Sequence, residues 1–191
     1  MASRDIWSRA GSLQVRDLLA SLLASLLSSR LLAEASTAPL YVCSPYLTDF
    51  PVFDNAFGQF QPLFRQHPEQ GERAEIMFSQ ALIELSGRMP VRFIGVPGEY
   101  ASAFLRAAVR ADSPNISGRF ASDLYHEKGL LCSSFYVEGS MNFTYSGVYR
   151  RDEKITAHTP ETPEGLQKIA AATLEFNRLW ETLAGSEIPR T

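Results

Sequence analysis

Two kinds of hydrophobic pattern alternate along the chain and predict helices and strands in turn. Between Ser12 and Ala35 the leucines recur at helical spacing, with alanines and serines on the opposite side. This pattern is typical of an amphipathic helix that buries one face. We therefore expect residues 1–36 to contribute an N-terminal helix that packs on a single larger domain, residues 37–191.

Short apolar runs bounded by proline, glycine or serine predict strands, and longer periodic segments predict further helices. The predicted strands are Leu40–Ser44, Val91–Val96, Ile116–Ala121, Tyr125–Cys132, Phe135–Glu138 and Glu153–His158. The predicted helices are Glu72–Arg88, Glu99–Arg110 and Thr162–Leu183, the last with a buried stripe of Leu166, Ile169, Thr173, Phe176 and Trp180. Strands that alternate with helices predict an α/β fold in which helices flank a mixed sheet.

An aromatic stretch, Tyr46–Pro68, follows the first predicted strand and shows no regular period. Its phenylalanines are Phe50, Phe53, Phe57, Phe60 and Phe64. We expect them to lie in the core or in a dimer interface, since large aromatic side chains contribute strongly to both. A platform on which nucleic-acid bases stack is the alternative.

The composition is that of a globular protein: 45% of the 191 residues are hydrophobic and 20% are charged. A net charge of −3 argues against a general nucleic-acid coat protein, which carries a basic excess. It leaves open an enzyme with a local basic groove, because net charge says nothing about how charge is distributed.

The leucine-rich segment near the N-terminus follows Arg4, Arg9 and Arg16 and so shares one feature with a secretory signal. Asp5 and Asp17 interrupt the positive region, however, and serines are interleaved with the leucines. The segment is also too short and too strongly patterned to span a bilayer. The sequence therefore predicts a cytoplasmic protein that does not associate with a membrane.

Cys43 and Cys132 each lie in an apolar run. Buried, reduced thiols are the interpretation that suits a cytoplasmic protein. A disulfide between the two is the alternative, because the strands that carry them could be neighbours.

The segment that indicates chemistry begins near Tyr125. His126 and Lys128 are two positions apart on a predicted strand, so their side chains point to the same face. An imidazole and an ammonium group on one face suit the binding of an anion. They would make a poor core, since lysine is almost never fully buried without a partner.

Neutral hydrogen-bond donors follow across the predicted hairpin. The tight turn at Gly139 brings the hydroxyl of Ser140 and the carboxamide of Asn142, both suited to phosphate oxygens. A helix that began near Ser140 would add its N-terminal amides to the same anion site. Glu153 opens the next strand, where a carboxylate can hold the tautomer of a histidine and raise its basicity.

These residues resemble the motif of the phospholipase D superfamily, which is a histidine, any residue, a lysine, four residues, an aspartate and then a glycine-serine-any-asparagine turn. His126, Lys128, Ser140 and Asn142 match it in order. The spacing from Asn142 to Glu153 matches that of small bacterial endonucleases of the superfamily. The resemblance implies the layered phospholipase D-like fold.

One position departs from the motif. The family's aspartate would fall at position 133, where this chain has Ser133. In the family that aspartate mainly braces the turn, so its loss is compatible with catalysis. The loss also leaves open a weakened site or one that only binds.

The resemblance implies a mechanism for the candidate catalytic residues. One His126 attacks phosphorus and forms a phosphohistidine, while a second histidine protonates the leaving oxygen and then activates water. Lys128, Ser140 and Asn142 hold the phosphoryl oxygens and stabilise the charged transition state. Glu153 orients and polarises the nucleophile.

Two such motifs are needed for one site, and this chain has one. His67 and His158 lack a neighbouring lysine and a downstream turn, and we expect His158 at the surface at the end of its strand. A two-fold homodimer with a shared site would supply the second motif. The resemblance implies no cofactor, and the histidines and cysteines show no metal-ligand spacing.

Arg150, Arg151 and Lys154 form a basic cluster close to the motif. Contact with phosphates that flank the scissile one is one interpretation, and a solvated charged surface is the other. The stretch Ser44–Asn55 further resembles the phospholipase-D-like protein encoded with bacterial systems that place 7-deazaguanine bases in DNA.

Three functions follow. The first is a DNA endonuclease in a restriction or defence system, acting with DNA and with other proteins of that system. The second is a hydrolase of phospholipids or other small phosphodiesters. The third is a catalytically reduced subunit that binds DNA or assists assembly.

Overall fold

The computed structural model describes residues 3–8, 13–29, 37–99, 103–105, 108 and 115–187. Its described strands are β1 (Arg4–Ser8), β2 (Leu40–Cys43), β3 (Pro51–Asp54), β4 (Glu75–Met77), β5 (Val91–Gly95), β6 (Ile116–Phe120), β7 (Gly129–Cys132), β8 (Phe135–Gly139) and β9 (Glu153–His158). Its described helices are α1 (Gln14–Ser28), α2 (Pro68–Gly71), α3 (Phe78–Ser86), α5 (Tyr145–Tyr149) and α6 (Pro163–Thr182), with a 3₁₀ turn η2 (Gln61–Leu63).

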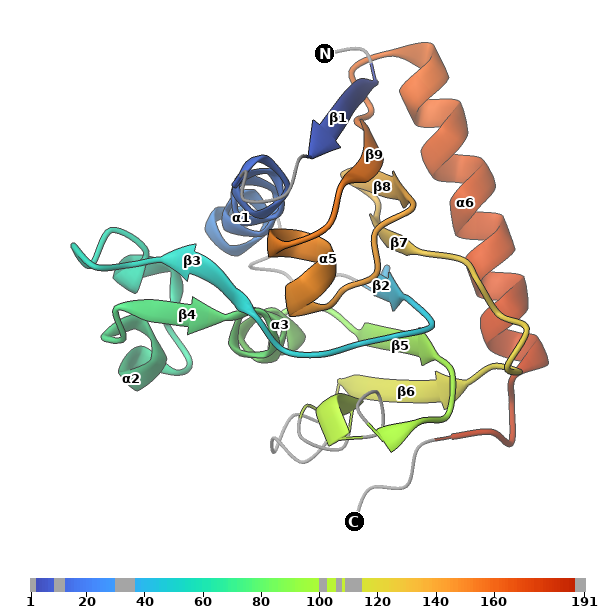
Figure 1. Cartoon of the computed structure of the whole chain (residues 1–191), viewed down its shortest axis with the longest axis horizontal. Coiled ribbons are helices and arrows are strands. Elements are labelled where there is room, and N and C mark those ends of the chain that lie inside the picture. Colours follow the sequence, from blue (N-terminus) through green and yellow to red (C-terminus); the bar gives the residue numbers. More distant parts are fainter. Residues whose placement is uncertain are drawn as a thin grey trace.

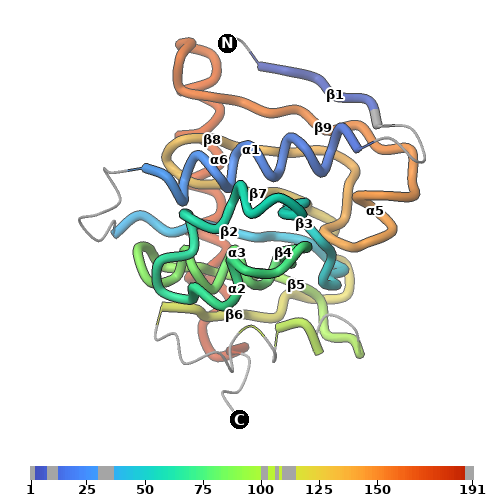
Figure 2. Tube along the Cα trace, turned by 90° about the vertical axis from the view of Figure 1, so that its left-hand side faces the viewer, coloured from blue at the N-terminus to red at the C-terminus, as the bar shows by residue number. Residues whose placement is uncertain are grey.

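The main sheet is mixed, as predicted. Within the described residues it has seven strands in the order β1-β9-β8-β7-β2-β5-β6, which can be followed from top to bottom in Figure 2. Strands β2, β5 and β6 are parallel, and the remaining neighbours are antiparallel. The predicted α/β fold with a mixed sheet is confirmed.

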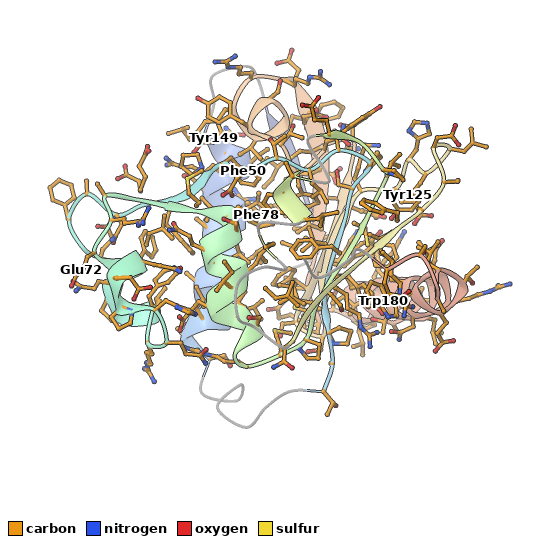
Figure 3. All side chains as sticks on the ribbon, turned by 90° about the horizontal axis from the view of Figure 1, so that it is seen from below. Phe50, Glu72, Phe78, Tyr125, Tyr149 and Trp180 are labelled. Carbon is orange, nitrogen blue, oxygen red and sulfur yellow. The ribbon has the colours of Figure 1, made fainter. Side chains whose placement is uncertain are left out.

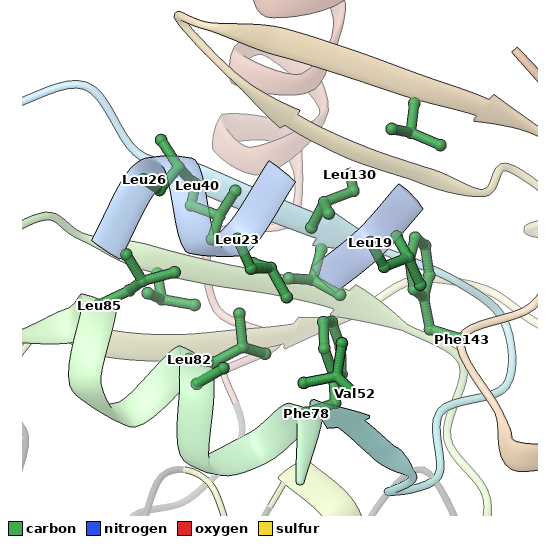
Figure 4. Close-up of a cluster of buried hydrophobic side chains, with 14 of the residues drawn as sticks. Leu19, Leu23, Leu26, Leu40, Val52, Phe78, Leu82, Leu85, Leu130 and Phe143 are labelled. Carbon is green, nitrogen blue, oxygen red and sulfur yellow. The ribbon is translucent and has the colours of Figure 1, made fainter. Parts of the chain in front are cut away.

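Helices cover the two faces of this sheet unequally. In Figure 1, α1 and α3 lie on one side and α6 on the other. The first face forms the larger core, in which leucines of α1 and α3 meet strand residues and Phe78 (Figure 4). On the second face α6 packs on the middle strands through Ile169, Ala172, Phe176 and Trp180. Helix α6 also contacts β9, and β1 forms the outer edge of the described sheet.

The alternation along β9 shows which side chains face which layer. Ile155 and Ala157 point into the core beneath α1, and Lys154 and Thr156 therefore point to the α6 side. The same rule holds on β1, where Ile6 is buried on the α1 side. The α6 side of β9 and β1 is thus a polar surface beside the covered part of the sheet.

Several predicted elements differ from the observed ones. The predicted helix Glu72–Arg88 is in fact β4 followed by α3, because Glu75–Met77 pairs with β3 in a small second sheet. Strands β1 and β3 and helix α5 were not predicted. The predicted helix Glu99–Arg110 lies largely outside the described residues, as does the predicted domain boundary at residue 36.

The long helices follow the predicted periodicity at most positions. α1 buries Val15, Leu19, Leu23, Leu26 and Leu27. In the predicted stripe of α6, Ile169, Phe176 and Trp180 are buried, but Thr173 is only half-buried and Leu166 is 55% exposed. Gly165 and Ala172 are buried in their place. No helix among the described residues is long and apolar enough to cross a membrane.

The aromatic stretch is mainly core, as one of the two interpretations held. Phe50, Phe53 and Phe64 are buried, and Phe50 stacks on Phe78 with 4.9 Å between the ring centroids. Phe57 is the exception, with 93% of its surface exposed.

Both cysteines are buried free thiols. Cys43 belongs to the core beneath α6, whereas Cys132 belongs to the core on the opposite face. The alternative of a disulfide between them is therefore wrong, since the sheet separates the two sulfur atoms.

Candidate active site

His126 and Lys128 lie at one end of the sheet, on an irregular segment that leads into β7. The predicted strand from Tyr125 is wrong for these residues, because pairing with β2 begins only where Gly129 meets Cys43. His126 is exposed and Lys128 is half-buried. The ammonium of Lys128 donates to the backbone carbonyl of His126, with 2.5 Å between Nζ and the oxygen. The two residues are therefore in contact, although no strand pairing holds them.

The turn after β8 is closed by three hydrogen bonds to the start of β9. The Ser140 N–H donates to the carbonyl oxygen of Lys154 at 3.0 Å, and the Lys154 N–H donates to Ser140 Oγ at 3.1 Å. Ser140 Oγ in turn donates to Glu153 Oε2 at 2.5 Å. Gly139 makes this closure possible, with φ of +150° and no room for a Cβ beside the Lys154 carbonyl.

Asn142 is held against the end of β2 by a residue that the sequence did not single out. Ser44 is fully buried, and its Oγ lies 3.3 Å from Asn142 Oδ1. The Ser44 hydroxyl donates to the Tyr46 carbonyl oxygen at 2.7 Å, and its oxygen accepts the N–H of Phe143 at 3.2 Å. A serine at the end of an apolar strand was the available signal, since a buried hydroxyl needs partners.

Behind this turn the chain is anchored by packing. Phe143 is buried and stacks on Phe78 with 5.8 Å between the ring centroids. Helix α5 begins at Tyr145, where Thr144 Oγ1 accepts the N–H of Gly147 at 3.0 Å as an N-cap. The helix considered near Ser140 therefore starts five residues later, and its amides do not belong to the Ser140 turn.

Charge in the site is coupled between Lys128 and Glu153. Glu153 is 8% exposed and is hydrogen-bonded to Ser140. Burial lowers the pKa of Lys128 below that of an ordinary lysine, and the negative charge of Glu153 opposes this shift. Glu153 thus helps to keep Lys128 protonated. Its role in orienting the histidine stays a prediction.

A pocket of about 500 Å³ opens next to these residues on the α6 side. His126, Lys128 and Lys154 line it together with Tyr136 and Phe176. The pocket places the histidine and two ammonium groups around one space that a phosphodiester can enter.

Carboxylates share this pocket with the cations. Glu127, Glu138 and Glu175 also line it. Burial raises the pKa of Glu127, and the neighbouring charge of Glu175 raises it further. The local field is therefore mixed rather than uniformly positive.

The basic cluster near the motif is split by the fold. Lys154 lines the pocket, and its ammonium lies 3.4 Å from Asp5 Oδ2. Arg150 is exposed beyond α5, with its guanidinium 5.2 Å from the ring centroid of Tyr145. Arg151 is exposed next to it. Only Lys154 of the three lines the pocket that contains His126 and Lys128.

Ser133 is remote from these groups. It is exposed in the turn between β7 and β8, at the end of the hairpin opposite to Gly129 and Gly139. Four residues of extended strand separate it from Gly129, which is roughly 13 Å. The departure from the family motif therefore takes no side chain away from the site.

The other two histidines lie elsewhere. His158 is 4% exposed, with Nε2 2.8 Å from Glu138 Oε1 and its ring stacked on Tyr136, so its predicted surface position is wrong. His67 precedes α2, beside Glu69. Among the described residues, no group of three or more histidine, cysteine, aspartate or glutamate side chains is arranged to hold a metal ion.

The chain matches no protein-family model and no curated protein sequence. Solved structures do resemble it. Nuc from Salmonella typhimurium, a phospholipase D family member, matches with a TM-score of 0.54 and 15% identity over 97% of this chain and 95% of that one. NucT from Helicobacter pylori matches with a TM-score of 0.54 and 14% identity over 97% of this chain and 98% of that one.

Phosphatidylserine synthase from Haemophilus influenzae Rd KW20 matches with a TM-score of 0.51 and 14% identity, over 92% of this chain but 38% of that one. At these identities the likeness concerns the fold. The chain has a phospholipase D-like α/β fold, in which the mixed sheet is flanked by helices.

Replacement of Gly139 by alanine should destabilise the protein and disorder the site. The positive φ alone costs about 1–3 kcal/mol in the free energy of unfolding for a residue with a Cβ, and the overlap with the Lys154 carbonyl adds to it. Urea denaturation measures this loss. Gly98→Ala is the matched control, because a Cβ there meets nothing within 4 Å. Equal stability of the two variants would contradict the assigned turn geometry.

Proposed function

We propose that this protein is a phosphodiesterase that needs no metal ion and cleaves DNA through a phosphohistidine intermediate, as a homodimer. The observation that carries the proposal is that His126, Lys128, Ser140, Asn142 and Glu153 lie on segments that meet at one end of the sheet, where Gly129 pairs with Cys43 and Glu138 and where Gly139 pairs with Ile155. They come from segments before β7, after β8 and at the start of β9. A structural role alone does not require an exposed histidine beside a half-buried lysine.

The chemistry assigns one task to each group. A ring nitrogen of His126 forms a bond to phosphorus as the bond to the leaving oxygen breaks, and a second histidine donates a proton to that oxygen. Water then attacks phosphorus, gives its proton to the second histidine and releases His126. The charged ammonium of Lys128 and the N–H groups of the neutral Asn142 carboxamide stabilise the negative charge on the phosphoryl oxygens during both steps. Ser140, held by Glu153, fixes the position of the turn.

The second histidine comes from a second copy of the chain. The other histidines cannot serve, since His158 is buried against Glu138 and His67 lies by α2. Figure 3 supports this separation, because Glu72, next to α2, lies on the side of the molecule opposite to Tyr125. Exposure of His126 is what a site shared across a two-fold axis requires.

Two observations favour DNA as the substrate: which solved structures the chain matches over nearly their full length, and where the cationic side chains lie. The chain spans nearly the full length of Nuc and NucT but 38% of the phosphatidylserine synthase. The sequence likewise resembles small endonucleases with a single motif. Lys154 lies where it can bind a phosphate beside the scissile one, and Arg150 and Arg151 extend the cationic surface past α5.

The biological setting follows from the resemblance of the stretch Ser44–Asn55. We place the enzyme in a bacterial DNA restriction system, where it acts with partner proteins. An acidic chain gains DNA affinity from such partners, since its own net charge of −3 provides little.

Cleavage of plasmid DNA should persist in excess EDTA and should depend on His126. We expect His126→Ala to lower the rate by about 10³-fold or more, because the variant lacks the nucleophile. Gel analysis of plasmid DNA and release of a chromogenic phosphodiester both measure this. His67→Ala is the control and should retain activity. Absence of cleavage by a folded wild-type dimer would contradict the proposal.

Mixing subunits should reveal the shared site. When wild-type and His126→Ala chains are refolded together in equal amounts, activity should fall to about one quarter of that of the same total of wild-type chain, because only wild-type pairs carry both the nucleophilic and the proton-transferring histidine. A site contained within one chain would leave half of the activity. Sedimentation analysis of the mixture confirms that pairs form.

The pH–rate profile should report the coupling between Lys128 and Glu153. Activity requires the protonated amine, so it falls as pH rises through the lowered pKa of Lys128. Glu153→Gln keeps an acceptor for Ser140 but removes the charge that raises this pKa. The alkaline limb of the profile should therefore move to lower pH. Glu72→Gln, on the far side of the molecule, should leave the limb in place, and an unmoved limb in Glu153→Gln would refute the coupling.

A further inference from the structure

Trp7 is a large apolar side chain in an exposed position on the outermost strand. Its indole is 67% exposed, although neighbouring Ile6 is buried. In the register of the sheet, Trp7 lies directly opposite Lys154. Residues directly opposite in an antiparallel pair share a face, so Trp7 points to the α6 side of the sheet.

This face is the one that carries the pocket. Lys154 lines the pocket together with His126 and Lys128. From the other side of β9, the Ser140 N–H donates to the Lys154 carbonyl oxygen and Ser140 Oγ accepts the Lys154 N–H. The catalytic turn, Lys154 and Trp7 therefore form a row across the sheet, with one strand spacing of about 4.8 Å between neighbouring strands.

The indole lies beside a cation that is itself paired with a carboxylate. The Lys154 ammonium lies 5.1 Å from the indole ring centroid and 3.4 Å from Asp5 Oδ2. Asp5 also accepts a hydrogen bond from Thr156 Oγ1 at 2.6 Å. One ring face is thus close to a cation, and the site combines a phosphate-binding charge with a flat aromatic surface.

We propose that Trp7 stacks on a nucleobase adjacent to the scissile phosphate, while Lys154 binds the phosphate between them. This inference rests on the proposed function and deepens it, because it assigns a base-contacting residue to the site and favours an unpaired strand whose bases are free to stack. Stacking on an aromatic ring accepts any base and adds to phosphate binding.

A protein partner is the less suitable occupant. The cores of protein interfaces are depleted of charge and bury about 800 Å² on each side. The described neighbours of Trp7 on this face are Asp5, Lys154 and Thr156, all polar. A single indole among charged groups suits a ligand that is itself charged and flat.

Tryptophan fluorescence tests the proposal directly. The chain has two tryptophans, and Trp180 is 8% exposed, so Trp7 is the one that a ligand can reach. The His126→Ala protein, which keeps Trp7, is titrated with oligothymidylate and with an abasic strand of the same length. Oligothymidylate should quench the emission, and the abasic strand should bind more weakly with little quenching.

Variants supply the second measurement. Trp7→Ala in the same background should weaken oligothymidylate binding about tenfold, which corresponds to about 1.4 kcal/mol. Binding of the abasic strand should not change. Phe57→Ala is the matched control, because Phe57 is also an exposed aromatic residue but lies after β3. It should leave both affinities unaltered.

Other outcomes overturn the inference. Equal loss of affinity for both strands in Trp7→Ala would mean that no base is contacted, and dissociation of the dimer in that variant would make Trp7 an interface residue. Cleavage of a chromogenic phosphodiester by Trp7→Ala with intact His126 separates the two proposals. If Trp7→Ala retains cleavage and binds oligothymidylate as tightly as before, the role of Trp7 is refuted but the proposed function stands. If the wild type does not cleave, the proposed function is refuted.

Discussion

The candidate site depends on the closure of the Gly139–Ser140 turn onto the first residues of β9. A hydroxyl that accepts from Lys154 and donates to Glu153 fixes the end of β8 to β9. Glycine is required because the backbone there is too close to the Lys154 carbonyl for a side chain. The motif residues therefore have a structural role in addition to the chemical role that we propose for them. Its serine organises the turn that presents Asn142 and brings Glu153 within electrostatic range of Lys128.

Helices cover the two faces of the sheet unequally, and this difference determines what surrounds the Gly139–Ser140 turn. Helix α6 covers the middle strands on its side and contacts β9, whereas Lys154 on β9 and Asp5 and Trp7 on β1 stay exposed. A fully covered sheet would have buried Lys154 and Trp7, and an uncovered one would have left no wall for the pocket. The N-terminal strand β1 adds one strand to the sheet beside β9 (Figure 1).

The mixture of positive and negative side chains in the pocket lowers its electrostatic attraction for a polyanion. Three carboxylates line it beside His126, Lys128 and Lys154. Such a pocket attracts a polyanion less than a uniformly basic groove does. Specific contacts then contribute a larger share of the binding free energy, and a stacking indole is one contact that salt screens little. The proposed dependence on a second subunit or on partner proteins for DNA affinity agrees with this balance of charge.

The sequence by itself determined the class of fold and the identity of the motif residues, because both are local in the chain. Periodicity placed most strands to within a residue or two, and β9 was placed correctly at both ends. It could not find β1 or separate β4 from α3, since short strands exist only through their partners. Tertiary structure alone decided that Ser44 supports Asn142 and that Trp7 lies beside Lys154. It also buried His158 and placed Ser133 away from the site. These outcomes depend on which strands become neighbours, and that choice is made by the packing of the whole sheet rather than by any one segment.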